Sequence, residues 1–331
     1  MSGYGMVFTA FNDLMLAAID EASRRGRRDA DIEHLFLGII TSNYPPGHAL
    51  RRTGVTLIQA RQSVDDQHAH QLQLVGVNTG LPEPGRTTAQ ESTGHQLTRR
   101  AQEILNPASS DEITYTSEVL RRLLKEPSGF ISEVLLRLQI TEEQLLSELE
   151  KSAEETSPEI LSAERGVLEG KSTIFVPASA RQIWDLVSAA ERMPEWDQAL
   201  EAVKPLVDDE ETWEAQPREE LPNGTPIKTK PNNRRQLIRR VTARKPEMVL
   251  WTLTFPDAPK SNVLQRAITL TEVEEGTQLE ASVRWIQPTK SLSIFSRIAR
   301  AAIGRPARPV MRYFVRMQAA EIARGISRRF Q

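Results

Sequence analysis

Chemically reactive side chains are unevenly distributed along this chain of 331 residues. It contains no cysteine, and all of its histidines fall in the first half: His34, His48, His68, His70 and His95. Thiol nucleophiles, disulfides and cysteine-ligated zinc or iron–sulfur sites are therefore excluded. Catalysis in the second half would have to use Asp, Glu, Arg, Lys or Tyr, because the common general base is missing there.

Three short patterns could carry chemistry, but none meets its requirements. Glu195 and Asp197 are spaced like a carboxylate pair, although alternate residues near a helix end usually face solvent. His68 and His70 lie two apart in a polar stretch without a supporting cluster at ligand spacing. The string at 166–172 has one residue too few between its glycines for a phosphate loop, and it leads into a strand. We expect no catalytic residue, no metal, no cofactor and no ATP hydrolysis.

The composition is that of a soluble globular protein, with 39% hydrophobic and 26% charged residues. The chain begins with no signal-like segment, and no apolar run approaches the roughly 18 residues of a membrane span. We therefore expect a cytoplasmic protein. Its length is about twice that of a typical domain, which predicts two domains. The net charge of −2 combines an acidic first half, residues 1–155, with a basic second half, residues 156–331.

The first half has helical periodicity. Residues 8–63 carry apolar side chains at the i, i+3, i+4, i+7 spacing of helices with one buried face. Thr9 is a candidate N-cap, and Gly26 is a candidate helix stop. A further helix is expected around 33–40. Residues 65–96 are polar and glycine-bearing, so a loop is expected there.

This helical pattern recurs after 85 positions. The shift sets Glu33-His34-Leu35 over Glu118-Val119-Leu120, Leu50 over Leu135, and Val55-Thr56 over Ile140-Thr141. The opening Phe8-Thr9-Ala10 aligns with Leu97-Thr98-Arg99 only after a four-residue adjustment. Such self-similarity predicts a duplicated all-α domain over residues 1–150, with repeats at about 8–64 and 97–150.

After a linker expected at 151–165, the pattern changes to alternation. A strand is expected at 168–176 and a helix at 179–190, followed by strands at 235–241, 247–255, 266–272 and 277–286. Asn223-Gly224 is a hairpin-type turn signal. A helical tail from 292 to 330, interrupted at Pro306 and Pro309, closes an α+β domain over residues 166–331.

The helical tail is basic, with ten Lys or Arg and one acid, Glu321, between positions 290 and 331. The spacing predicts one buried stripe made of Val310, Phe314, Met317 and Ile322. The arginines fall on another face: Arg308, Arg312, Arg316, Arg324 and Arg328. Such a basic helix face is usually solvated. It can also make weak peripheral contact with an anionic membrane. No nucleic-acid motif accompanies it, so nucleic-acid binding is not expected.

Several motifs in the first half resemble a known family. They are Phe8-Thr9, Asp31-Ile32-Glu33-His34-Leu35-Phe36-Leu37-Gly38 and Leu50…Thr53-Gly54-Val55. Through them residues 8–150 resemble the duplicated amino-terminal domain of Clp-family unfoldases, especially ClpC. The ATPase modules that follow this domain in the unfoldases are missing, so the chain should not unfold proteins by itself.

The Clp resemblance implies a peptide-binding role. Domains of this type dock substrates and adaptors, and some bind phosphoarginine through a threonine and a glutamate in each repeat. By that resemblance the candidate pairs are Thr9 with Glu33 and Thr98 with Glu118. The chemistry suits the ligand, because a helix N-terminus favours phosphate and a carboxylate pairs with guanidinium. The alternative is that these residues only cap helices and begin them.

The second half resembles another superfamily. Its motifs are Val176-Pro177-Ala178, Ile183-Trp184-Asp185-Leu186-Val187 and Met193-Pro194-Glu195-Trp196-Asp197. Through them residues 166–331 resemble the START-like, or SRPBCC, helix-grip folds, whose members bind lipids, sterols or polyketides or catalyse cyclisation. The resemblance implies a cavity closed by the last helix. Its candidate lining is Trp184, Trp196, Trp251, Phe255, Trp285, Phe314 and Met317, although buried aromatics are more often plain core.

Together these resemblances imply a non-enzymatic protein that couples a Clp-type peptide-binding module to a domain for a small apolar ligand. It would act as an adaptor or decoy, with a ClpC-type unfoldase or its substrates and adaptors as partners. Two alternatives remain open. The second domain could be a cyclase-like enzyme, or it could be a lipid carrier; the Clp-like domain would then be regulatory or structural.

Overall fold

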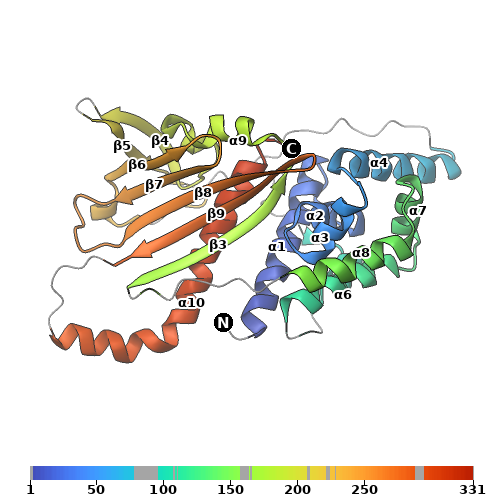
Figure 1. Ribbon diagram of the computed structural model, residues 1–331, viewed down its shortest axis with the longest axis horizontal. Coiled ribbons are helices and arrows are strands. Elements are labelled where there is room, and N and C mark those ends of the chain that lie inside the picture. The colour runs from blue at the N-terminus through green and yellow to red at the C-terminus, as the bar shows by residue number, and fades with distance from the viewer. Residues whose placement is uncertain are drawn as a thin grey trace. The chain divides into compact units, whose positions relative to one another are not determined.

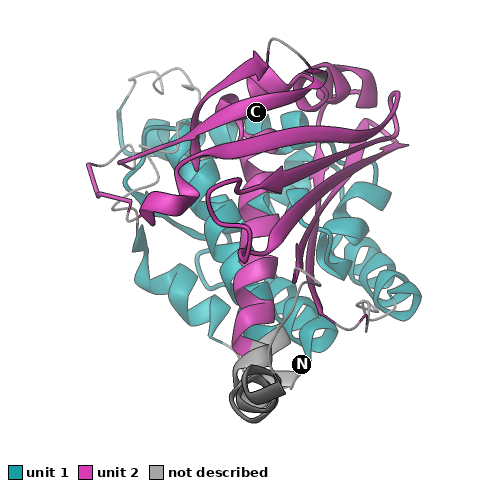
Figure 2. Cartoon of the chain, turned by 90° about the vertical axis from the view of Figure 1, so that its left-hand side faces the viewer, with its two compact units in different colours: residues 1–159 teal, residues 160–331 magenta. Residues whose placement is uncertain are grey.

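The computed structural model describes residues 3–77, 96–106, 109, 111–156, 164, 166–206, 209–220, 224–227, 229–287 and 294–330. The chain divides into two compact units, Met1–Glu159 and Ile160–Gln331 (Figure 2). The expected turn residue Asn223, the histidine His95 and the side chain of Arg308 lie outside the described residues.

The first unit is helical (Figure 1). Its elements are α1 (Gly3–Arg24), β1 (Asp29–Ala30), α2 (Ile32–Thr41), α3 (Pro45–Arg52), α4 (Leu57–Leu74), β2 (Gln96–Leu97), α5 (Arg99–Leu105), α6 (Glu112–Leu124), α7 (Phe130–Arg137) and α8 (Glu142–Glu155). The two short strands pair in parallel. The helical class expected for this half is therefore confirmed.

Helices of the first unit keep the spacing of the two predicted repeats. Helices α3 and α7 begin 85 positions apart, and so do α4 and α8. Thr56 and Thr141 cap α4 and α8 with the same capping box, completed by Gln59 and Gln144. Helix α3 packs on α8, and α4 packs on α7. Each repeat therefore buries its later helices against the other repeat.

Three local expectations for the first unit were wrong in detail. Helix α1 begins at Gly3, so Thr9 is buried inside a helix and does not cap it. Helix α4 continues to Leu74 through polar residues expected to form a loop, because no helix breaker occurs before Gly76, which has a φ of 78°. Helix α8 runs to Glu155, into the segment expected to be linker. The stop at Gly26 is confirmed by its φ of 62°.

The second unit contains one antiparallel sheet and a long C-terminal helix. Its elements are β3 (Val167–Val176), α9 (Ala180–Val187), η1 (Ala190–Glu195), β4 (Leu200–Leu206), β5 (Asp209–Pro217), η2 (Pro231–Asn233), β6 (Gln236–Arg244), β7 (Met248–Thr254), β8 (Val263–Val273), β9 (Gly276–Ile286) and α10 (Ile294–Ser327). The strand order is β3-β9-β8-β7-β6-β5-β4. This arrangement is consistent with the expected helix-grip fold.

Helix α10 packs on β3 and β9, across one face of the sheet (Figure 1). We call the sheet face covered by α10 the inner face. Two glycines allow this packing: a Cβ on Gly170 would collide with the backbone of Arg316, and a Cβ on Gly325 would collide with the carbonyl oxygen of Trp196. The C-terminal part of α10 is therefore held between β3 and the segment that follows η1.

The predicted buried stripe of α10 was wrong at Val310 and Phe314 and correct at Ile322. Val310 and Phe314 are 56% and 53% exposed, and the buried stripe consists of Val315, Ala319, Ile322, Ala323 and Ile326. The close approach of α10 to Gly170 determines which face of the helix is buried, because it turns the helix backbone at Val315 toward the sheet.

Two other expectations for α10 fail as well. Arg324 and Arg328 are buried and pair with Glu321, so they are not part of a solvated face. The helix also continues through Pro306 and Pro309. No helix within the described residues is long and apolar enough to cross a membrane.

Candidate functional sites

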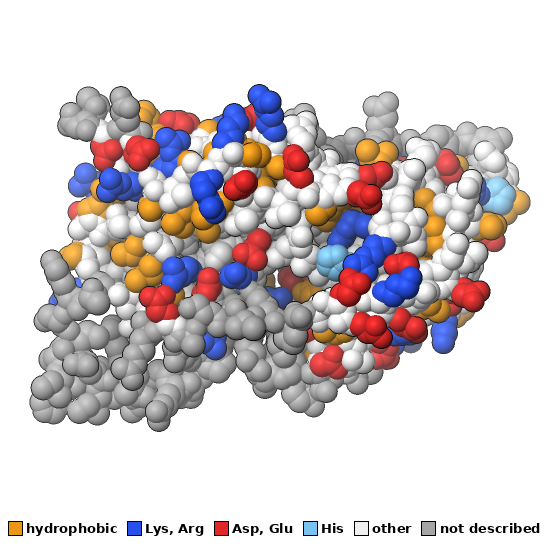
Figure 3. All heavy atoms as spheres, viewed as in Figure 1, with side chains coloured by type: hydrophobic (Ala, Val, Ile, Leu, Met, Phe, Trp, Pro, Cys, Tyr) orange, Lys and Arg blue, Asp and Glu red, His pale blue; other side chains and the backbone are white. Residues whose placement is uncertain are grey.

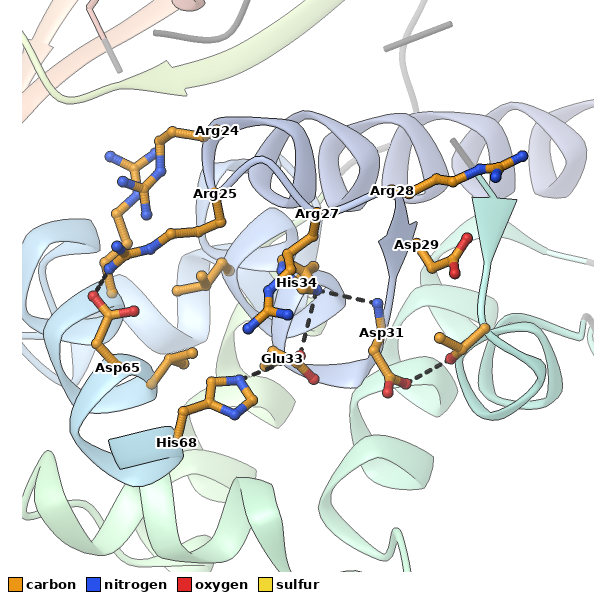
Figure 4. A pocket seen from close by; sticks show the side chains of 14 residues that line it. Arg24, Arg25, Arg27, Arg28, Asp29, Asp31, Glu33, His34, Asp65 and His68 are labelled. Atoms are coloured by element: carbon orange, nitrogen blue, oxygen red, sulfur yellow. Dashed lines mark hydrogen bonds and ion pairs between the residues drawn. The ribbon is translucent and has the colours of Figure 1, made fainter. Parts of the chain in front are cut away.

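The helical unit contains a cavity of about 360 Å³ where α1 ends and α2 begins (Figure 4). Its wall also includes one side of α4. Charged groups dominate the lining, with arginines Arg24, Arg25, Arg27, Arg28 and Arg61 and carboxylates Asp29, Asp31, Glu33 and Asp65. Figure 3 shows that basic and acidic side chains also lie side by side on the surface of this unit. The cavity can therefore accept a ligand that carries both signs of charge.

Three of the five arginines are held by carboxylates. Glu21 is fully buried beside the cavity and accepts hydrogen bonds from Arg24 at 3.3 Å and from Arg61 at 3.0 Å. Burial alone would raise the pKa of Glu21, but the two guanidinium groups outweigh it and lower that pKa. Arg25 pairs with Asp65. These pairs give the cavity a fixed charged wall.

Arg27 and Arg28 differ from the other arginines of the cavity. Both are exposed, and neither forms an ion pair with a carboxylate of the described residues. They follow Gly26, whose left-handed conformation ends α1 and turns the chain toward β1. In Figure 4 the side chain of Arg28 extends away from Glu33. These two guanidinium groups are the cationic groups of the rim that are available to an anion.

Glu33 lies between two histidines (Figure 4). Its Oε1 is 3.5 Å from Nδ1 of His34 and 3.4 Å from Nε2 of His68. Burial would raise the pKa of Glu33, yet the hydrogen bond with His68 and the charge of His34 lower it. His68 also stacks against Phe130 of α7, with ring centroids 4.8 Å apart. Glu33 therefore stays ionised in the cavity and is tied to the second repeat through His68.

Thr98 reaches the same cavity from the second repeat. The pairing of Ala30 with Leu97 places it beside the start of α2. Its hydroxyl donates to Oδ1 of Asp31 at 2.6 Å, and its oxygen caps α5 by accepting from the N–H of Ala101. Asp31 caps α2 and pairs with Arg100. One threonine therefore joins the starts of two helices from different repeats.

The residues implied by the Clp resemblance are grouped differently in the structure from the two expected pairs. Glu33 and Thr98, which belonged to different expected pairs, line one cavity. Thr9 and Glu118 are not among its lining residues; Glu118 lies in the middle of α6 and pairs with Arg122. His68 was missed as a site residue because it was assigned to a loop. No group of three or more His, Asp or Glu side chains in the described part of the chain is placed to hold a metal ion.

Three of the six aromatic residues expected to line a pocket in the second unit are core. Trp184, Trp196 and Trp251 are buried, the last two completely. Trp251 packs edge-on against Trp213, at 5.7 Å between ring centroids. Trp213 was not among the residues expected to line the pocket. Phe255, Trp285 and Met317 are half-buried, and Phe314 is exposed.

Apolar side chains remain accessible at one end of the inner face. Trp285 of β9 lies directly opposite Leu168 of β3 and Leu264 of β8, and all three are only partly buried. The indole N–H of Trp285 donates to Gln318 of α10 at 3.0 Å. Phe314 lies one turn before Gln318 on the same side of the helix. We call the group Leu168, Leu264, Trp285 and Phe314 the open end.

An ion pair lies farther along the same face of β8. Arg266 alternates with Leu264 and Ile268, so its side chain is on the inner face. It pairs with Asp197, which follows η1, and the two side chains are 12% and 7% exposed. The carboxylate of Asp197 also accepts from the N–H of Ala199 at 3.0 Å. Both charges are therefore engaged inside the unit.

Residues 168–326 match the model of the family described as polyketide cyclase / dehydrase and lipid transport. The family model does not extend to the helical unit, for which the Clp resemblance stays a prediction. A comparison with curated proteins gave no match.

Solved structures with similarity include the di-domain ARO/CYC StfQ from the steffimycin biosynthetic pathway, at 13% identity and a TM-score of 0.29, covering 54% of this chain and 60% of that one. The crystal structure of Ara h 8.0201 is 11% identical in sequence, with a TM-score of 0.29. The similarity covers 45% of this chain and 98% of that one. The protein of unknown function SA2116 from Staphylococcus aureus is 12% identical in sequence, with a TM-score of 0.31. The similarity covers 50% of this chain and 96% of that one.

Proposed function

We propose that the second unit, a polyketide cyclase-like domain over residues 168–326, binds a small apolar molecule at its open end. The observation that carries the proposal is the partly exposed group around Trp285, which the sheet and α10 bring together from three strands and a helix. Apolar area that folding leaves accessible to solvent favours contact with apolar ligands. Phe314, 53% exposed, adds an aromatic ring to this surface.

We propose further that this unit binds its ligand without converting it. The second unit has no histidine and no cysteine. On its inner face Asp197 is engaged by Arg266 and by a backbone N–H, which leaves it poorly placed to accept a proton from a ligand. A ligand recovered chemically unchanged after long incubation supports a binding role; a new product that requires the folded protein would contradict it.

Fluorescence titration of the full chain with N-phenyl-1-naphthylamine tests the binding proposal. We expect saturable binding with about one site per chain. Phe314→Ser should weaken it about tenfold, because the exposed ring is replaced by a hydroxyl group. Val273→Ala is the matched control, since Val273 is an exposed apolar residue nine positions along β8 from Leu264, roughly 30 Å away. Absence of saturable binding would refute the proposal.

A second function is proposed for the helical unit. The cavity at Glu33 combines an ionised carboxylate with the exposed guanidinium groups of Arg27 and Arg28. Phosphoarginine carries the complementary charges, an anionic phosphoryl group and a cationic guanidinium. We propose that this cavity binds phosphoarginine in a peptide, in a Clp-type adaptor or decoy that meets a ClpC-type unfoldase or its substrates.

Calorimetry with the full chain tests this second function. A phosphoarginine peptide should bind at least tenfold more tightly than the same peptide with arginine. Glu33→Gln should remove most of this binding, because it replaces the carboxylate with a neutral amide of the same shape. Glu118→Gln is the control, since Glu118 pairs with Arg122 outside the cavity. Equal binding of the two peptides would refute the role in phosphoarginine recognition.

A further inference from the structure

Glu33 is a nearly buried carboxylate that lacks a short hydrogen bond from another side chain. Its side chain is 9% exposed and lines the cavity of the helical unit. His34 does not donate to it, because Nδ1 of His34 accepts the backbone N–H of Asp31 at 3.1 Å. Among the described residues, the side-chain donor within reach of its Oε1 is Nε2 of His68, at 3.4 Å. Buried charged groups are normally paired and well hydrogen-bonded, so Glu33 is placed to receive a cationic group of a ligand.

Thr98 lines the same cavity, but its hydroxyl is not available to an anion. The hydroxyl proton is donated to Oδ1 of Asp31 at 2.6 Å, and the oxygen accepts the N–H of Ala101 at 3.3 Å. A hydroxyl group has one proton to donate, so none is left for a phosphate or a carboxylate. Anion binding in this cavity therefore depends on the guanidinium groups that line it.

Arg27 is the guanidinium group best placed to bind an anion beside Glu33. It is exposed at the rim and forms no ion pair with a carboxylate of the described residues. In Figure 4 its side chain is directed toward Glu33, whereas that of Arg28 extends away from it. The binding group for a cation is therefore nearly buried, and the binding group for an anion lies at the entrance. A complementary ligand carries its cation at its tip and its anion nearer the entrance.

We infer that the cavity binds the C-terminal arginine of a peptide, with the guanidinium group on Glu33 and the terminal carboxylate on Arg27. A guanidinium group suits Glu33 because it pairs with a carboxylate through two parallel N–H donors. The terminal carboxylate lies at the other end of the same residue, beyond its methylene chain, and so remains at the rim. The inference goes beyond phosphoarginine recognition, because it needs no phosphorylation and uses a charge that only the end of a chain provides.

A pair of matched peptides tests the inference by calorimetry on the full chain. Both are short, acetylated glycine–serine peptides that end in arginine; one has a free terminal carboxylate and the other a terminal amide. We expect the peptide with the free carboxylate to bind about tenfold more tightly. Glu33→Gln should remove most of the binding of both peptides, because it replaces the partner of the guanidinium group with a neutral amide.

Arg27→Gln should bring the affinity ratio of the free and amidated peptides close to one. Arg99→Gln is the control, because it makes the same change of charge at an exposed residue that pairs with Glu103 outside the cavity, and it should preserve the ratio. Equal affinity of the wild type for both peptides, or an unchanged ratio in Arg27→Gln, would overturn the inference. An amidated peptide with an internal phosphoarginine tests the proposed function separately, because it has no terminal carboxylate.

Discussion

Asp197 and Arg266 form a nearly buried ion pair that joins the segment after η1 to the inner face of β8. Removing one partner of such a pair leaves an uncompensated charge in the interior. Arg266→Met should therefore lower the free energy of unfolding of the second unit by about 3–5 kcal/mol. Because all five tryptophans lie in this unit, urea unfolding followed by tryptophan fluorescence reports it selectively.

The double variant Asp197→Asn, Arg266→Met separates charge from packing. Asparagine keeps the shape of Asp197 and its acceptor for Ala199 but carries no charge. We expect the double variant to be more stable than Arg266→Met alone. Equal stability of the two variants would mean that the charge of Asp197 is not what destabilises the single variant.

The substitution Gly325→Ala is expected to destabilise the protein, although Gly→Ala usually stabilises a helix. In an exposed helix interior, Gly→Ala stabilises by about 1 kcal/mol. At position 325 the added methyl group would meet the carbonyl of Trp196, which belongs to the backbone and cannot rotate away. Gly325→Ala should therefore lower the melting temperature measured by tryptophan fluorescence. An increase would show that α10 is not packed closely against this segment.

The two capping boxes should contribute equally to the helical unit. Thr56→Ala and Thr141→Ala each remove a side-chain acceptor at a helix start, and each should lower the free energy of unfolding by about 1 kcal/mol. Ser147→Ala on the exposed face of α8 is the control, because it removes a hydroxyl that caps nothing. Far-UV circular dichroism measures these variants, since α-helices dominate the first unit. A loss at only one threonine would contradict the equivalence of the repeats.

The matching spacing of these helices was predictable because its signals are local. The residues that begin helices α4 and α8 keep the same spacing, and left-handed residues precede both, Gly54 with a φ of 82° and Gln139 with a φ of 59°. The strands from β6 to β9 were also predicted, because each is a run of seven or more residues rich in apolar and β-branched side chains. Strands β4 and β5 were missed. In β5 four acidic residues hide the alternation that buries Trp213 and Ala215.

Features that depend on distant contacts were not predictable in this way. The apolar residues of α10 fit more than one stripe, and a glycine more than 140 positions earlier selects which of them is buried. In the helical unit, both Glu33 and Thr98 were identified, but their grouping follows from the parallel pairing of β1 with β2. Two-residue strands carry no periodic signal, so the composition of the cavity could be known only from the structure.

The stability of the helical unit should depend on pH through His48. Burial, with the neighbouring Arg51, lowers the pKa of His48 to about 4. An unfolded histidine has a pKa near 6.5. The folded state therefore requires neutral His48, and its stabilising effect is complete above about pH 6.5 and is lost as the pH falls toward 4.

Because His48 is partly accessible to solvent, the expected loss between these limits is about 1–2 kcal/mol. His48→Gln cannot gain this proton, so its free energy of unfolding should fall less between pH 7 and pH 4.5 than that of the wild type. His70→Gln, at an exposed position on α4, should leave the pH dependence unchanged. Unfolding is followed by circular dichroism at 222 nm, and tryptophan fluorescence should show no difference among the three proteins, because it reports the second unit. Parallel curves for wild type and His48→Gln would mean that His48 is protonated as easily in the folded chain as in the unfolded one.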